Sequence, residues 1–179
     1  MWHALGNFKD AGLEYTGALK VLQMIFSYEY LWIQIRVKGG AYGCMCSFSD
    51  QGDSMFVTYR DPNLSESYKV YDEAADYVAD FDADDRDMKK YIIGTIGSMD
   101  MPMEAVDMGA RSFHAYFLGK TEADLQKVRD QVLSCTQEDI RALAPIVKAV
   151  VEAGNRCCIG NEEKIDQNKE YFDEVKHVL

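Results

Sequence analysis

The segment from Arg36 to Gly43 holds the residues of this chain whose types and spacing best suit chemistry on a peptide. Arg36 offers a guanidinium with a fixed fork of N–H donors, and Tyr42, six positions later, offers a phenolic O–H donor. Both groups suit carbonyl oxygens, including one that is becoming an oxyanion. Gly39, Gly40 and Gly43 lack a side chain, so another chain can approach the backbone closely here.

Residues that would complete a hydrolytic metal site are missing from the sequence. His3, His114 and His177 lie far apart, and no two of them form a zinc-binding pair on one helix turn. The acidic run at residues 80–87 lacks the glycine and the terminal Glu of a calcium loop, so we interpret it as a solvated helix start. We therefore expect no metal bound by this chain and interpret Arg36 and Tyr42 as half of a site.

Composition narrows the class of protein. A length of 179 residues with 47% hydrophobic and 27% charged residues is typical of one soluble globular domain. The net charge of −11 disfavours nucleic acid, which needs basic stripes, although it would attract basic peptides; solubility alone also explains it. No apolar run approaches the ~20 residues of a membrane span, and no secretory signal is present. We predict no membrane partner and a cytoplasmic location.

The five cysteines are consistent with reduced thiols in the cytoplasm, because their number is odd and no signal peptide precedes them. Cys44 and Cys46 lie in a strand pattern and would share one face. That spacing can chelate a soft metal, but it is also what buried structural cysteines show. The vicinal Cys157 and Cys158 would point to opposite faces.

Hydrophobic periodicity predicts a mostly helical chain around one hairpin. A helix over 14–35, broken near Ser27 or Tyr28, ends at Gly39 and Gly40 and leads into an antiparallel hairpin over 41–60. Further elements are predicted as helices over 65–81, 84–98 and 102–118, helices after the capping boxes at Thr121 and Thr136, a split at Pro145, a strand at 155–160 and a final helix or pair of helices over 161–178.

These elements predict an α+β fold in which several helices cover one face of a small, mainly antiparallel sheet. Three strands are few for so many helices. We therefore expect a further strand, either from sequence before Met1, which a truncated domain would lack, or from the poorly patterned residues 1–13. On the helix over 102–118 we expect His114, beside Phe113 and Phe117, to be partly buried and hydrogen-bonded.

The residue pattern resembles a known family. "YTGALKVL", "SYEYLWIQIRVKGGAYG", "TYRDPNL" and "NRCCIGNEEKI" follow one another as in the last domain of the presequence-protease branch of the pitrilysin/insulinase zinc metallopeptidases. The resemblance covers residues 6–168 and is most specific from Tyr30 to Gly43. It implies that residues 1–179 are a single C-terminal, substrate-clamping domain of a four-domain peptidase that closes around a chamber.

The resemblance also implies a role for two residues. In the family the last domain supplies an Arg and a Tyr that reach the substrate across the chamber, and these positions match Arg36 and Tyr42. The H-x-x-E-H zinc motif belongs to the first domain and is absent here, so zinc is expected in the N-terminal half of the longer enzyme and no catalysis from this chain alone. The implied partners are a peptide substrate and that N-terminal half.

Two alternatives remain open at this stage. The chain could be a stand-alone, non-catalytic interaction module of the same fold, which an upstream reading frame without H-x-x-E-H would favour. A thiol or soft-metal protein would require metal in the purified chain. Because a separated domain leaves apolar surface uncovered, we also expect self-association.

Overall fold

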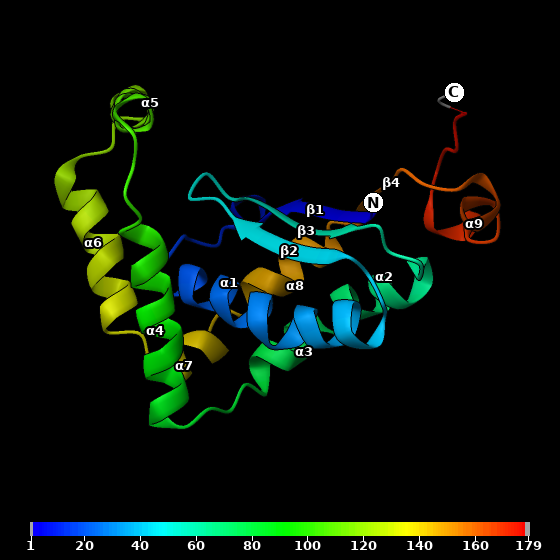
Figure 1. Cartoon of the computed structure of the whole chain (residues 1–179), viewed down its shortest axis with the longest axis horizontal. Coiled ribbons are helices and arrows are strands. Elements are labelled where there is room, and N and C mark those ends of the chain that lie inside the picture. The colour runs from blue at the N-terminus through cyan, green and yellow to red at the C-terminus, as the bar shows by residue number, and fades with distance from the viewer. Residues whose placement is uncertain (1, 178–179) are drawn as a thin grey trace.

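Four antiparallel strands form one sheet in the order β2-β3-β1-β4, in a computed structural model that describes residues 2–177 (Figure 1). The strands are β1 (Trp2–Asn7), β2 (Gly43–Phe48), β3 (Asp53–Tyr59) and β4 (Asn155–Cys158). The predicted hairpin is β2 and β3, and the expected extra strand comes from the N-terminal residues, because β1 lies between β3 and β4. β2 is an edge strand.

The helices that contact the sheet cover one of its faces (Figure 1), which confirms the predicted α+β fold. Among them are α1 (Ala18–Tyr28), α2 (Leu64–Asp72) and α8 (Ala144–Glu152). Residues that alternate along the strands toward these helices are buried, among them Ala4, Cys46 and Phe56. The opposite face leaves Met45 half exposed. This period-two pattern places the core between the sheet and the helices.

The remaining helices extend around and away from this core. They are η1 (Phe8–Ala11), η2 (Trp32–Lys38), α3 (Ala74–Ala79), α4 (Asp85–Met99), α5 (Ala105–Phe117), α6 (Glu122–Leu133), α7 (Gln137–Arg141), α9 (Glu162–Asp166) and η3 (Lys169–Tyr171). α4 and α6 pack beside α1, and α5 projects beyond them (Figure 1). No helix within residues 2–177 is both long and apolar enough to cross a membrane.

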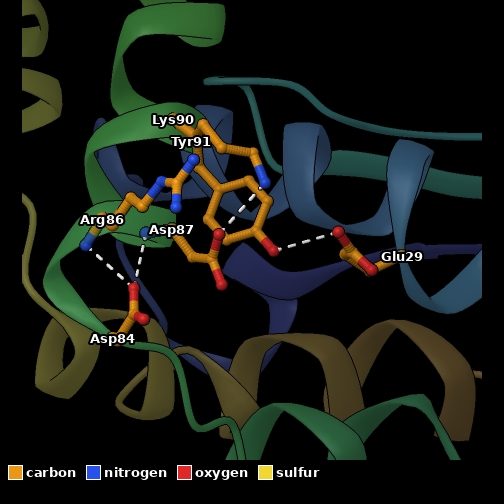
Figure 2. A network of polar contacts seen from close by, with 6 residues as sticks. All are labelled: Glu29, Asp84, Arg86, Asp87, Lys90 and Tyr91. Carbon is orange, nitrogen blue, oxygen red and sulfur yellow. Dashed lines mark hydrogen bonds and ion pairs between the residues drawn. The ribbon is translucent and has the colours of Figure 1, made fainter.

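The acidic start of α4 is a helix cap, as the sequence predicts. Figure 2 shows the Asp84 carboxylate accepting hydrogen bonds from the backbone N–H groups of Arg86 and Asp87, both at 2.9 Å. One turn later the Tyr91 phenol donates to the Glu29 carboxylate at 3.1 Å, which ties α4 to the end of α1. Partial burial and the Glu29 charge raise the pKa of Tyr91 above its ordinary value.

Capping boxes form at Thr121 and Thr136, and the chain splits before Pro145, which lies in the first turn of α8. Both features are confirmed. The break after α1 falls at Glu29, whose φ of −109° and ψ of −82° leave the helical region, one residue beyond the predicted position.

Two helix predictions need correction, and a third element is shorter than predicted. The helix over 65–81 is two helices, because Glu73 has a ψ of −5° where a regular helix has about −42°. The helix predicted from Pro102 begins only at Ala105. The final element, predicted as a helix or a pair of helices over 161–178, is the short pair α9 and η3, which ends at Tyr171; Val178 lies outside the described residues. α9 buries none of its residues, so it lacks the packed apolar face that usually extends a helix.

His114 also differs from the prediction. It lies on α5, which has no buried residues, and its side chain is exposed. Phe113 and Phe117 beside it are exposed as well, with their rings stacked 6.1 Å apart. The spacing of the apolar residues identified a helix, but it could not show whether a core lies against that helix.

Candidate functional site

Arg36 and Tyr42 lie on either side of a sharp corner between η2 and β2. η2 is a π-helix, a wider helix that occurs mostly in short pieces and often at functional sites. Its end is closed by backbone hydrogen bonds, including those from Gly39 to Gln34 at 3.1 Å and from Ala41 to Ile35 at 3.1 Å. We call residues 36–43 the corner.

The Arg36 side chain is fixed on both sides. Its guanidinium carbon lies 3.9 Å from the centre of the Trp32 ring, and its Nε donates a hydrogen bond to the backbone oxygen of Tyr42 at 3.0 Å. The structure therefore brings the two predicted residues together through the Tyr42 backbone. Because only Nε is used, the two Nη groups have no hydrogen-bond partner within residues 2–177.

The Tyr42 side chain is 66% exposed, although its ring is held in place. The ring meets that of Tyr59 edge to face, with 5.9 Å between the centres, and the Arg60 guanidinium lies 5.8 Å from the Tyr42 ring. Gly43 pairs with Tyr59 across the hairpin, so no side chain at 43 competes for that contact. The Tyr42 phenol has no hydrogen-bond partner among the described residues and is open to a ligand.

The glycines of the corner differ in what the fold requires of them. A Cβ on Gly39 would lie 2.5 Å from the Ile35 oxygen, and Gly40 has a φ of +76°, a left-handed conformation that disfavours other residues. Both glycines are needed to turn the chain. A Cβ on Gly43 would meet nothing within 4 Å, so the space beside the backbone is open there.

A loop after β3 supports the corner. The buried Asp61 carboxylate accepts hydrogen bonds from the Asn63 backbone at 2.9 Å and from the Ser67 hydroxyl at 2.5 Å. The Asn63 amide in turn donates to the Gly39 oxygen at 2.5 Å. This arrangement is an Asx turn, in which a carboxylate binds the backbone two residues on. It links the corner to α2.

Sequence reasoning missed two residues of the site. Trp32 precedes Arg36 by four positions, a spacing at which helical side chains meet, so the pair carried a readable signal. Arg60 is different, because its contact with Tyr42 depends on the hairpin register. Its φ of 49° is unusual for a residue other than glycine and marks local strain at the site.

The cysteines form no metal centre in the described part of the chain. All five are free, and no group of three or more His, Cys, Asp or Glu side chains within residues 2–177 could hold a metal ion. Burial raises the pKa of Cys44 to about 11 and raises that of Cys46 further, so both thiols stay protonated at neutral pH. Cys46 packs in the core as a small apolar residue.

The comparisons with known proteins define the class of this chain. The family model described as the PreP C-terminal domain matches residues 3–161, and the chain belongs to that family. Its relatives are peptidase regions, so the chain is a peptidase-associated domain. This confirms the family resemblance of the corner and its flanking elements.

Individual relatives are similar to most of this chain. The chain is 41% identical over 174 residues to Protein HypA of Clostridium perfringens, covering 97% of this chain and 18% of that protein. It is 33% identical over 178 residues to Presequence protease 1, chloroplastic/mitochondrial, of Arabidopsis thaliana, covering 97% of this chain and 16% of that protein. It is 34% identical over 151 residues to the mitochondrial presequence protease of Aspergillus fumigatus, covering 83% of this chain and 14% of that protein. The chain spans less than a fifth of the length of each.

Proposed function

We propose that this chain is the peptide-binding C-terminal domain of a zinc-dependent peptidase, and that Arg36 and Tyr42 hold the substrate backbone. The observation that carries this proposal is the corner itself, in a domain of the PreP family. There a fixed arginine and an exposed tyrosine meet at the edge of the sheet with N–H and O–H donors free for a ligand.

The donor set of the corner suits a peptide carbonyl. The Nη groups of Arg36 would bind a carbonyl oxygen of the substrate and fix its register. The Tyr42 phenol would donate to a neighbouring carbonyl or to the oxygen that becomes negative during hydrolysis. Because Trp32 stacks on Arg36 and Tyr59 packs on Tyr42, little side-chain freedom is lost when a peptide binds. The open space at Gly43 would admit the peptide backbone.

The described residues do not fit a zinc site, since no three potential ligands are grouped within residues 2–177. The proposal therefore assigns zinc to another domain of a longer enzyme, whose N-terminal half would also contact this one. When bound there, zinc would supply an activated water. The part of this chain is to position the carbonyl, and hydrolysis is not expected from the 179 residues alone. The five free thiols support a reducing compartment, for which we propose the cytoplasm.

Removal of the Tyr42 hydroxyl in the assembled peptidase tests this function. Tyr42→Phe should lower kcat by about 10²–10³-fold, since one lost donor to a developing oxyanion costs about 2.7–4 kcal/mol. Tyr59→Phe is the matched control, because it removes a phenol from the neighbouring ring while keeping the ring contact. The melting temperature should be unchanged in both variants. Turnover of Tyr42→Phe equal to that of Tyr59→Phe would rule out the assigned role.

A further inference from the structure

A large groove beside the corner is lined by residues of both β2 and α5. It has a volume of about 1000 Å³ and is lined by residues of α1, η2, β2, α4, α5 and α6. At one end lies Trp32, the residue that stacks on Arg36, and along one wall lie Cys44 and Phe48 of the edge strand β2. The groove therefore borders the corner, because Trp32 stacks on Arg36 and Cys44 directly follows Gly43.

The charges in this groove are opposite to those of the whole chain. Three basic side chains line it, namely Lys20 on α1, Arg111 on α5 and Lys120 in the following turn, and the carboxylate that lines it is Asp50. The chain as a whole has a net charge of −11. A basic groove on an acidic protein is a local feature that solubility does not explain.

The Asp50 carboxylate that lines the groove already has a partner. Lys120 forms an ion pair with Asp50, and although partial burial opposes it, this contact lowers the pKa of Asp50. Lys20 is half-buried, and burial lowers its pKa; Asp50 acts in the opposite direction, while Arg111 and Lys120 add to the lowering. One carboxylate thus serves several cations within the groove, and Lys20 lacks a full counter-charge.

The carboxylate of Asp100, outside the groove, is already engaged elsewhere. Asp100 lies close enough to influence Arg111, but it is held by two hydrogen bonds of 2.6 Å from Arg129. Arg111 itself contacts only the sulfur of Met103, at 3.8 Å, among the hydrogen bonds of the described residues. Arg111 and Lys20 line the same groove and lie close enough to influence each other, so both would attract an anion bound there.

The shape of the groove indicates which anion fits. Apolar side chains, among them Met24, Phe48 and Leu125, line it beside the cations, and its β2 wall is an unpaired sheet edge. Apolar walls and a strand edge suit an extended peptide more than a bare inorganic ion. We propose that this groove binds a carboxylate of the peptide held at the corner, so that the domain selects peptides with an acidic group. This rests on the proposed peptide-binding function.

Four fluorescent peptides of one sequence test the proposal with the 179-residue chain. They carry Glu or Gln at one interior position and a free or amidated C-terminus, which separates a side-chain carboxylate from a terminal one. Fluorescence anisotropy should give a Kd about tenfold lower for a peptide with the recognised carboxylate than for its neutral partner. Raising the salt concentration should shrink that difference.

Matched variants locate the effect. Lys20→Met and Arg111→Gln should abolish the preference for the carboxylate. Lys89→Met, which removes an exposed charge from α4 outside the groove, should retain it. Asp50→Asn should strengthen binding of the acidic peptide, because it removes the competing carboxylate. Circular dichroism checks that each variant is folded.

The outcomes separate this inference from the proposed function. Equal binding of all four peptides, weakened by Tyr42→Phe, would overturn the groove proposal and leave the corner intact. A loss of preference in Lys89→Met as large as in Lys20→Met would also overturn it, since only net charge would then matter. Binding of none of the four peptides would overturn both proposals.

Discussion

The corner and α5 both border one groove and differ in how their side chains are satisfied. Arg36 of the corner is fixed between a ring and a carbonyl, and the residues that support the corner are buried: Ile35 is 1% exposed, and the Asp61 carboxylate accepts two hydrogen bonds. On α5 no residue is buried, and Phe113 is 68% exposed. Contacts within the chain hold the side chains at and around the corner in place, whereas the side chains of α5 are not buried by such contacts.

The orientation of α5 shows what this difference means. Arg111 and His114 face the groove, whereas the exposed apolar side chains form a stripe along the helix: Val106, Phe113, Tyr116 and Phe117. An amphipathic helix normally turns its apolar stripe toward a core. A rigid corner suits positioning of a substrate, while an uncovered stripe of this kind marks a contact surface. The expected self-association stays a prediction.

The largest expected difference between the two regions concerns stability. Ile35→Ala should lower the free energy of unfolding by about 2–5 kcal/mol, because it opens a cavity in the core beneath the corner. Phe113→Ala removes a larger side chain from α5, but it should change the free energy of unfolding by less than about 0.5 kcal/mol, because this side chain is exposed. Urea denaturation of both variants measures this. Similar losses would show that α5 is packed in solution.

The buried Asp61 carboxylate, in the loop that supports the corner, gives the next effect. Asp61→Ala should cost about 1–3 kcal/mol, because it leaves the buried Ser67 hydroxyl and the Asn63 backbone without an acceptor. Asp107→Ala on α5 removes an exposed carboxylate and should cost less than about 0.5 kcal/mol. Thermal unfolding compares the pair, and an Asp61 variant as stable as the wild type would contradict the role of this loop.

Replacing a glycine by alanine should change the free energy of unfolding in opposite directions in the two regions. Gly40→Ala should destabilise the chain by about 1–2 kcal/mol, because the φ of +76° places its new Cβ in the left-handed region. Gly109→Ala on α5 should stabilise by up to about 1 kcal/mol, since alanine favours a helix and nothing lies within 4 Å of the new Cβ. The same sign of change in urea midpoint for both would refute this contrast.

The smallest expected effect depends on pH and lies in the groove. Burial lowers the pKa of Lys20 in the folded chain below its ordinary 10.5, so the unfolded chain binds the proton of this ammonium group more tightly. The charged Lys20 therefore lowers the free energy of unfolding at neutral pH, and this loss is recovered as the pH rises from the lowered pKa toward 10.5. Lys20→Met removes the penalty of the buried charge. It should raise the melting temperature by about 1–3 °C at pH 7 and by less at pH 9.5. Lys89→Met should show neither change.

Much of the site could be predicted from sequence because its signals are local. Arg36 and Tyr42 frame a helix end marked by Gly39 and Gly40, and such ends follow from backbone sterics within a few residues. The π-helical form of η2 could not be predicted, since its hydrogen bonds differ from those of an α-helix by one residue while the sequence pattern is the same.

The contact between Arg60 and Tyr42 required the hairpin register, and the groove required the placement of several helices around an edge strand. No periodicity encodes either. His114 shows the limit most clearly: its neighbours in sequence are aromatic, yet it lies exposed, because burial depends on what another segment places against a helix.

The sequence by itself determined the α+β class, the caps, the hairpin and the membership of a peptidase-associated family, because each depends on short-range preferences or on a run of matched residues. Only the tertiary structure decided that Lys20, Arg111 and Lys120 meet in one groove of an acidic protein. Lys20 and Lys120 are far apart in the sequence, and they share an electrostatic environment only because tertiary packing brings their segments together.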